Sequence, residues 1–357
     1  MNATALLRAD LHDFAGYRSA DREAVPGDIR LNANEAARPN ATDALDRLRR
    51  YPPAQPPALC EALAQLYGCA TDQLLVARGS DEAVDLLVRA TCAPGQDAVL
   101  VTPPTFGMYA VCARLHGAHV IEAPLQDQGD RWALDAQAAI DAAVATDAKL
   151  VFLCSPGNPT GGVVAREALL AVLDALRGRA LVVVDEAYIE FATAASAIEL
   201  VDAYQGLAIL RTLSKAHALA GLRIGCVIAQ AGLIAALRRC QAPYPVPEPC
   251  ARLAVSALQS AALAATRAAL ARTVDARETM CRALGAGAGV RSVYRSDANF
   301  VLVRFNNVDA IYTRLLDAGV VVRDMRAFSG LGDALRISIG TAAQNSLVLT
   351  VIQGQPP

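Results

Sequence analysis

The hydrophobic positions between residues 60 and 230 form short apolar runs that alternate with longer Ala/Leu-rich stretches. Several of these runs are apolar throughout, which is typical of strands buried on both faces of a sheet. The stretches between several of them, such as 166–176, have the spacing of helices that connect parallel strands. The predicted strands are 98–102, 119–122, 150–154, 181–185, 207–211 and 224–229. This pattern predicts an α/β fold with a largely parallel sheet flanked by helices.

A Pro-rich segment at 243–249 cannot continue a regular element and marks a boundary. The segment after it, 251–286, has a strongly helical pattern, and the remaining runs suit a smaller α+β domain with strands at 299–304, 320–323 and 335–339. We therefore expect an N-terminal arm with part of the small domain at 1–38, a large domain at 39–244 and the rest of the small domain at 245–357.

Composition and charge narrow the class of protein. The 357 residues carry 33 Lys+Arg and 35 Asp+Glu, so there is no basic surplus for a nucleic-acid partner. No apolar stretch approaches the roughly 18 residues of a membrane span, and the N-terminus lacks the layout of a signal peptide. The nine cysteines form an odd set without a C-x-x-C pair, which favours scattered thiols over disulfides or a metal site. The sequence thus predicts a cytoplasmic globular protein without membrane, nucleic-acid or metal partners.

Only two of the 33 basic residues are lysines, Lys149 and Lys215. A lysine amine can deprotonate and form a Schiff base, whereas a guanidinium cannot. Lys149 stands at the entry to a predicted strand, where a solvated charge is the ordinary interpretation. Lys215 follows the predicted strand 207–211, and we therefore expect a chemical role for it.

Chemically distinct side chains follow four of the predicted strands. In open parallel sheets, ligands bind beyond the carboxyl ends of the strands. The residues that come just after strands in this chain are an aromatic ring, an amide, a carboxylate, a phenol and the rare lysine, namely Phe106, Asn158, Asp185, Tyr188 and Lys215. Each residue alone is weak evidence for a functional site; Asp185, for example, could be a helix cap. Together the five residues predict one site.

A possible phosphate site precedes a helical pattern at 83–90. Gly79 and Ser80 would leave free backbone N–H groups at the helix N-terminus, which is a favourable place for an anion, although ordinary capping explains the same residues. Motifs of nicotinamide dehydrogenases, P-loop NTPases, α/β-hydrolases and zinc proteases are absent from the sequence.

The combined set of side chains matches what pyridoxal 5′-phosphate requires. This cofactor needs a lysine for a Schiff base, an acid beside the pyridine nitrogen, donors to the ring oxygen, a flat aromatic on the ring face and a phosphate site. Asp185 would favour the protonated ring nitrogen by its opposite charge. Lys215, once displaced by substrate, would be an amine able to move a proton.

Several longer segments resemble the class II aminotransferases of fold type I. These segments are VVDEAYIEF (183–191), LRTLSKAHALAGLR (210–223) and SPGNPTG (155–161). Further segments are most similar to the histidinol-phosphate aminotransferases, namely LNANE (31–35), RYP (50–52), GSDE (79–82), PPTFGMY (103–109), SDANF (296–300), VRD (322–324) and LRISIGT (335–341). The likeness extends over 14–341, and it departs from the usual pattern after LNANE, where Ala-Ala-Arg-Pro replaces Asn-Pro.

The resemblance implies the fold of a fold-type I pyridoxal-phosphate-dependent transferase, with a mostly parallel mixed sheet in the large domain, and it implies roles for single residues. Lys215 would hold the cofactor, Asp185 would pair with the ring nitrogen, and Tyr188 would complete the catalytic set. Asn158 and Tyr188 would bond to the ring oxygen, and Phe106 would stack on the ring. The cofactor phosphate would contact Ser80, Asp81, Ser214 and Arg223, with Thr212 as a weaker candidate.

The resemblance also implies a homodimer in which the two active sites are shared. Tyr51 would reach the cofactor phosphate of the partner subunit. Arg323 and Arg336 would bind the substrate anion, and Tyr17 with Asn34 would line the substrate pocket.

The predicted activity is amino-group transfer between L-histidinol phosphate and 2-oxoglutarate in histidine biosynthesis. The same scaffold also suits an aromatic amino-acid aminotransferase or an enzyme like threonine-phosphate decarboxylase, because cofactor motifs do not choose the side-chain pocket. A cofactor-binding protein without catalysis and a Rossmann oxidoreductase are the alternatives of other classes.

Overall fold

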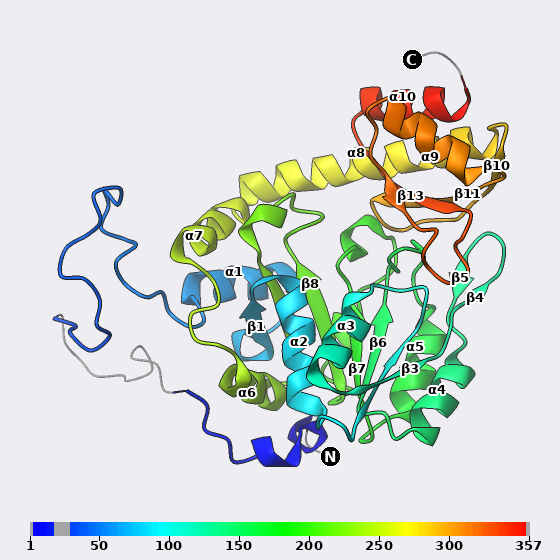
Figure 1. Cartoon of the computed structure of the whole chain (residues 1–357). Helices are drawn as coiled ribbons and strands as arrows, with labels where there is room; N and C mark the ends of the chain where they lie inside the picture. Colours follow the sequence, from blue (N-terminus) through cyan, green and yellow to red (C-terminus); the bar gives the residue numbers. More distant parts are fainter. Residues whose placement is uncertain (1–2, 18–28, 355–357) are drawn as a thin grey trace.

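The computed structural model describes residues 3–17 and 29–354, and a seven-stranded sheet lies at the centre of this part of the chain (Figure 1). Its strands, in the order in which they lie side by side, are β1 (Leu74–Ala77), β9 (Gly225–Ala229), β8 (Leu207–Thr212), β7 (Leu181–Asp185), β6 (Leu150–Cys154), β2 (Ala98–Val101) and β3 (His119–Glu122). The five strands from β8 to β3 pair in parallel, and β9 is antiparallel to both of its neighbours. The prediction of a mostly parallel mixed sheet is confirmed.

Strand β1 is the one strand of this sheet that the sequence pattern missed. Its four residues, Leu-Leu-Val-Ala, are too few and too rich in good helix formers to be distinguished from a helix by pattern alone. They become a strand because they pair with β9, from which they are separated by about 150 residues of chain.

Two layers of helices bury the two faces of the sheet. Alternate residues of each strand point to opposite faces, so Leu74 and Val76 pack in one core while Leu75 and Ala77 pack in the other. The first face is covered by α1 (Pro57–Tyr67), α4 (Ala136–Ala145), α5 (Arg166–Ala175) and α7 (Glu248–Ala257). The second face is covered by α2 (Gly79–Thr91), α3 (Met108–His116) and α6 (Ala231–Cys240). Because helices cover both faces, inner strands such as β6 and β9 are buried and apolar throughout, whereas the edge strand β3 begins and ends with exposed polar residues.

A smaller four-stranded antiparallel sheet packs with the C-terminal helices. Its order is β10 (Val290–Val293), β11 (Phe300–Phe305), β13 (Ala334–Ser338) and β12 (Arg323–Asp324), and it packs against α9 (Val308–Asp317), α10 (Ala342–Ile352) and the end of α8 (Ser260–Gly285). The strand predicted at 320–323 is shorter and later than expected. Strand β10 was missed because its four residues, Val-Arg-Ser-Val, neither alternate in polarity nor form an apolar run. A two-stranded hairpin, β4 (Gln126–Asp127) with β5 (Trp132–Ala133), lies beside this sheet (Figure 1).

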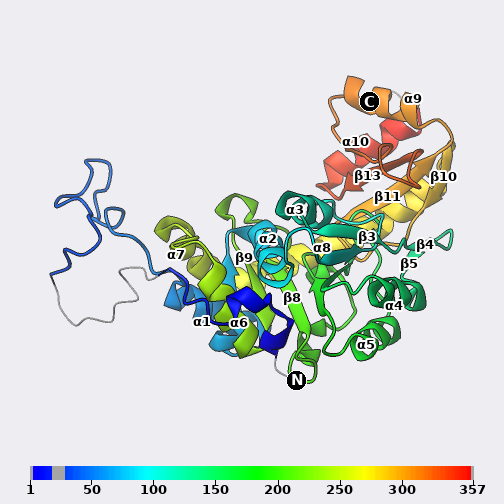
Figure 2. The ribbon, with the colours of Figure 1, turned by 60° about the horizontal axis from the view of Figure 1, so that its bottom comes forward.

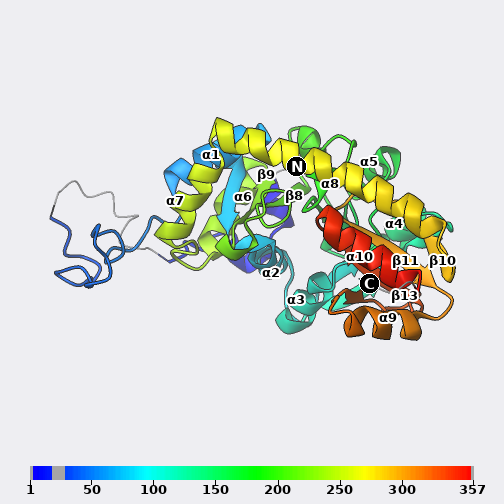
Figure 3. The same ribbon diagram turned by 90° about the horizontal axis from the view of Figure 1, so that it is seen from above.

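The predicted helix at 251–286 is two helices. Helix α7 ends at Ala257, α8 begins at Ser260, and their axes differ by 73°. Figure 3 shows α8 crossing from the large sheet to the C-terminal helices, so it connects the two units. In the described part of the chain, no single helix combines the length and apolarity of a membrane span, and the bent pair α7–α8 does so by length and composition only.

The N-terminal region has two differently packed parts. The short 3-10 helices η1 (Ala3–Leu6) and η2 (Ala9–Leu11) lie beside α6, with Leu7 buried in the core of the large unit. Residues 29–53 instead form an arm that extends away from the body near α1 and α7 (Figure 1 and Figure 2). The domain limits 1–38, 39–244 and 245–357 stay a prediction.

Candidate active site

A cavity of about 540 Å³ opens at the carboxyl ends of β6, β7 and β8, between the large sheet and strands β12 and β13. It is lined by every predicted site residue except three, namely by Ser80, Asp81, Phe106, Asn158, Asp185, Tyr188, Thr212, Ser214, Lys215, Arg223, Arg323 and Arg336. Residues that are up to 256 positions apart in the chain thus meet at the edge of the sheet that the strand pattern indicated.

Lys215 projects into this cavity from the loop that follows β8. The loop is held by Thr212, whose Oγ1 accepts a hydrogen bond from the Ser214 backbone N–H at 3.1 Å. The Lys215 Nζ lies 5.6 Å from the centre of the Tyr188 ring. Although the side chain is accessible from the open cavity, the surrounding protein lowers the pKa of Lys215, first by burial and then through the nearby charge of Arg336. A larger fraction of this amine is therefore neutral than for an ordinary lysine.

Asp185, the last residue of β7, is almost fully buried and is held at both carboxylate oxygens. Its Oδ2 accepts a hydrogen bond from the Tyr109 hydroxyl at 2.7 Å, and its Oδ1 accepts one from the Ala187 backbone N–H at 3.1 Å. Burial raises the pKa of Asp185, and both hydrogen bonds act in the opposite direction. The carboxylate is fixed in orientation at the floor of the cavity.

Asn158, Tyr188 and Arg336 form a connected polar group on another wall. The Asn158 amide nitrogen lies 3.5 Å from the Tyr188 hydroxyl oxygen, and the Arg336 guanidinium donates to the Asn158 side-chain oxygen. The guanidinium also stands 5.1 Å from the centre of the Phe300 ring. Among the described residues the buried Arg336 Nε has no hydrogen-bond partner, which leaves this donor available to an acceptor from outside the chain.

The N-terminus of α2 forms the third wall, and the backbone there is unusually close-packed. Gly79 has φ +78°, and a Cβ on it would lie 2.7 Å from the Arg223 Nη2, while a Cβ on Gly225 would lie 2.6 Å from the Ser80 backbone nitrogen. Both glycines therefore permit an approach that a side chain would block. The Arg223 guanidinium is 2.9 Å from the Asp81 carboxylate. Free N–H groups at a helix start beside an arginine make this wall suitable for an anion.

Comparisons with known proteins agree with this geometry. The family described as "Aminotransferase class I and II" matches residues 17–352. The chain is 58% identical to a histidinol-phosphate aminotransferase of Stenotrophomonas maltophilia and 57% identical to one of Xanthomonas euvesicatoria, in each case over 98% of this chain and 96% of the relative. The chain belongs to the class I and II aminotransferase family. The solved histidinol-phosphate aminotransferase of Sinorhizobium meliloti in complex with pyridoxal-5′-phosphate has a TM-score of 0.75 and 26% identity, covering 83% of this chain and 80% of that one.

As an aminotransferase of this family, the present chain depends on pyridoxal 5′-phosphate, and the residues that line its cavity fit that group. One cavity is lined by all the groups that the cofactor needs. These are a lysine with a lowered pKa, a buried carboxylate, an amide beside a phenol, and a helix N-terminus that suits an anion. Because Gly79 and Gly225 carry no Cβ, no side chain crowds the Ser80 backbone N–H or the Arg223 guanidinium at the start of α2, where a phosphate would bind. The Arg336 Nε, which has no partner among the described residues, is a further donor for an anion.

Three predicted residues of the aminotransferase lie on the N-terminal arm or beside it rather than in the cavity of their own chain. Tyr17, Asn34 and Tyr51 do not line the cavity, and the Tyr17 and Tyr51 side chains are 63% and 58% exposed. The Tyr51 ring stacks on the Tyr244 ring with centres 4.7 Å apart. The Tyr51 backbone N–H donates to Glu35, which also pairs with Arg50, so the motifs LNANE and RYP are joined in the arm. Their predicted contacts with a partner subunit stay predictions.

The structure adds residues that the sequence analysis did not assign. Nine further residues with side chains line the cavity, namely Thr105, Met108, Val111, Cys154, Pro159, Ala187, Ala220, Met325 and Phe328. Tyr109 was part of the PPTFGMY motif without an assigned role, and it lies in the first turn of α3, which begins at Met108. No sequence pattern indicated that Met325 and Phe328 line the cavity, because their loop reaches it only through the pairing of β12 with β13.

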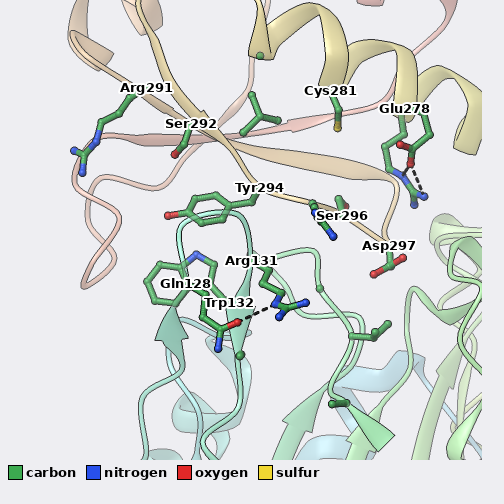
Figure 4. A pocket seen from close by; sticks show the side chains of 18 of the residues that line it. Gln128, Arg131, Trp132, Glu278, Cys281, Arg291, Ser292, Tyr294, Ser296 and Asp297 are labelled. Carbon is green, nitrogen blue, oxygen red and sulfur yellow. Dashed lines mark hydrogen bonds and ion pairs between the residues drawn. The ribbon is translucent and has the colours of Figure 1, made fainter.

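A second, larger cavity of about 910 Å³ lies between the β4–β5 hairpin, the loop at 162–165, α8 and β10 (Figure 4). Figure 4 shows Trp132 and Tyr294 at one end and Glu278 and Asp297 at the other. Its lining contains no lysine, and three of its arginines are paired, Arg277 with Glu278 at 3.1 Å, Arg291 with Asp333 at 2.6 Å and Arg295 with Asp130 at 2.9 Å. The chemistry of the lining residues, rather than the volume, therefore favours the smaller cavity as the candidate active site.

Proposed function

We propose that the chain transfers the amino group of L-histidinol phosphate to 2-oxoglutarate, giving imidazole acetol phosphate and L-glutamate, within histidine biosynthesis. The observation that carries this proposal is the pair Arg323 and Arg336, which lie opposite each other on neighbouring strands at the cavity that contains Lys215. Relatives that share 57% and 58% of their residues with this chain are histidinol-phosphate aminotransferases.

The two arginines account for both substrates with one subsite. Arginine binds phosphate and carboxylate alike through paired N–H donors. In one half-reaction the subsite holds the phosphate of the amine, and in the other it holds a carboxylate of the oxo acid. Arg336 is anchored by Asn158 and Phe300 and presents its remaining donors, whereas Arg323 is exposed at the cavity edge.

Three residues supply the remaining chemistry of the proposal. When bound, pyridoxal 5′-phosphate supplies an electron sink for the substrate carbon. Lys215 Nζ, with its lowered pKa, holds the cofactor and then moves the proton at the substrate carbon. Asp185 keeps a negative charge opposite the ring nitrogen, and burial raises the pKa of Tyr188 so that its hydroxyl stays a neutral donor to the ring oxygen.

The proposal includes a homodimer with shared sites. The arm exposes large apolar side chains that a lone chain leaves in water, namely Ile29, Leu31, Leu45, Leu48 and Tyr51. If a second copy covered these side chains, Tyr51 and Asn34 of the arm would approach the cavity of that second copy, and Tyr17, which precedes the arm in the chain, would line the same cavity. Mixing inactive Lys215→Ala chains with chains that carry Tyr51→Ala tests this, because a shared site regains activity in the mixed dimer and separate sites do not. The nine unpaired thiols support a reducing, cytoplasmic location.

An absorption spectrum of the purified protein tests the activity. With the cofactor present, we expect a visible band that L-histidinol phosphate alone converts to the shorter-wavelength amine form of the cofactor. Phenylalanine and threonine phosphate serve as comparison amines and should convert the band much more slowly. A band that ignores histidinol phosphate but responds to phenylalanine would transfer the proposal to an aromatic aminotransferase. The absence of any band would contradict the role of Lys215.

A further inference from the structure

The Tyr109 hydroxyl is the only side-chain donor that the structure places on Asp185 within residues 3–17 and 29–354. Tyr109 belongs to the first turn of α3 and is fully buried, and its oxygen is 2.7 Å from the Asp185 Oδ2. Its ring is fixed by Phe152 of β6, with ring centres 4.5 Å apart and planes within 1° of parallel, and Phe106 meets its edge at 5.5 Å. The hydroxyl therefore has little freedom to point elsewhere.

The direction of this hydrogen bond follows from the environment. Burial raises the pKa of Tyr109 well above its ordinary value, and the nearby Asp185 charge raises it further, so the phenol keeps its proton and donates it. A hydrogen bond to a carboxylate stabilises the ionised form, and it is worth more in a buried site than at the surface. Tyr109 thus opposes the effect of burial, which would otherwise favour a neutral Asp185.

We propose that Tyr109 is a positioning residue that orients the Asp185 carboxylate toward the cofactor ring and keeps it ionised there. With the Ala187 N–H on Oδ1 and the Tyr109 hydroxyl on Oδ2, both oxygens are held and the carboxylate plane is fixed. Without the hydroxyl, Asp185 becomes a stronger base and draws the proton that it shares with the ring nitrogen toward itself. The inference rests on the proposed function, because it requires the cofactor in this cavity.

The variant Tyr109→Phe removes one oxygen and keeps the ring that stacks on Phe152. The chain offers a matched control, Tyr294→Phe, since Tyr294 is equally buried and its hydroxyl donates to Asp127 at 2.7 Å outside the active-site cavity. Both variants lose a phenol–carboxylate hydrogen bond, which is buried at Tyr109 and partly buried at Tyr294, where Arg304 Nε also donates to the hydroxyl at 2.7 Å, so both are expected to lose some stability. Only Tyr109→Phe should change the cofactor site.

The decisive measurement is the ¹⁵N NMR signal of cofactor labelled at the ring nitrogen and bound to the full chain, together with the dissociation constant of the cofactor. For Tyr109→Phe we expect a signal shifted toward unprotonated pyridine, a cofactor dissociation constant raised about tenfold, and kcat lowered about 10- to 100-fold with little change in KM. Tyr294→Phe should match the parent protein in all of these quantities.

The outcomes separate the inference from the proposed function. A parent protein that binds no cofactor contradicts both. A parent that binds the cofactor and reacts with histidinol phosphate, beside a Tyr109→Phe variant with an unshifted ring-nitrogen signal and kcat within about twofold, overturns the inference alone. Equal changes in the Tyr109→Phe and Tyr294→Phe variants would also overturn it, because they would reflect stability rather than Asp185.

Discussion

Arg336 of β13 and Arg323 of β12 are directly opposite partners in an antiparallel strand pair, so two positive charges face each other at the cavity. Like charges in such positions destabilise a sheet by roughly 0.2–1 kcal/mol. Neither arginine has a carboxylate within ion-pair distance among the described residues. Burial lowers the pKa of Arg336, and the charge of Arg323 contributes in the same direction. The repulsion between the two arginines therefore lowers the free energy of unfolding of the protein without a bound anion. An anion bound between them would relieve the repulsion.

Replacing Arg336 by alanine should affect both half-reactions. Because a charged hydrogen bond contributes about 1.5–3 kcal/mol, we expect kcat/KM to fall about 10- to 100-fold for histidinol phosphate and for 2-oxoglutarate alike. Steady-state kinetics with each substrate varied in turn measures this. The control is Arg291→Ala, which removes an arginine of the same sheet that pairs with Asp333 outside the active-site cavity and should leave turnover unchanged. A loss confined to one substrate would contradict a shared anion subsite.

Replacing Arg323 by alanine should separate stability from function. We expect the free energy of unfolding of the cofactor-free protein to rise by a few tenths of a kcal/mol to about 1 kcal/mol, because the repulsion with Arg336 is removed. The KM for both anionic substrates should rise at the same time. Urea unfolding and kinetics on the same preparation measure the two effects, and a loss of stability would refute the account of the pair.

The two lysines of the chain provide a test with a built-in control. Lys215→Ala should abolish the visible band of the lysine-bound cofactor and lower turnover at least about a thousandfold, since no other residue in the cavity carries an amine. Lys149→Ala removes a lysine that pairs with Asp147 at 2.6 Å on the surface, and it should leave the band and turnover as they are. Retention of the band in the Lys215 variant would be incompatible with the site described here.

The lowered pKa of Lys215 predicts how stability depends on pH in the cofactor-free protein. Between the lowered folded-state pKa and the ordinary value of 10.5, the unfolded chain binds more protons at this residue than the folded chain does. The free energy of unfolding contributed by Lys215 therefore rises with pH across that window. In Lys215→Met this rise should be absent, so the parent and the variant should converge in stability as the pH approaches 10.5. Parallel pH profiles from urea unfolding would show that the pKa is not lowered.

The buried ion pairs of Arg211, next to the candidate active site, should contribute more to the free energy of unfolding than an exposed ion pair does. Arg211 of β8 donates to Glu186 at 3.1 Å and to Glu190 at 2.7 Å, and its guanidinium lies 4.4 Å from the centre of the Tyr67 ring. Arg211→Ala leaves two buried or nearly buried carboxylates without their partner, so we expect the free energy of unfolding to fall by about 3–5 kcal/mol. Arg89→Ala, which removes an exposed pair with Asp85, should change it by less than about 0.5 kcal/mol. Similar losses in both variants would contradict the importance of burial.

The sequence by itself determined six of the seven strands of the large sheet and the residues at the carboxyl ends of four of them. Runs such as 150–154 and 181–184 are apolar throughout because helices cover both faces, and this local signal can be recognised without knowledge of the fold. Lys215, Asp185 and Asn158 could be grouped from the sequence because parallel strands bring their carboxyl ends to one edge.

Only the tertiary structure decided the features that depend on pairing between distant segments. Strand β1 exists because of β9, and the opposition of Arg323 and Arg336 exists because β12 pairs with β13 in one register out of several. The bond from Tyr109 to Asp185 joins a helix to a strand 76 residues away, and no periodicity within either segment encodes it. Local patterns record which face of an element is buried, whereas register and side-chain contacts follow from the packing of the whole chain.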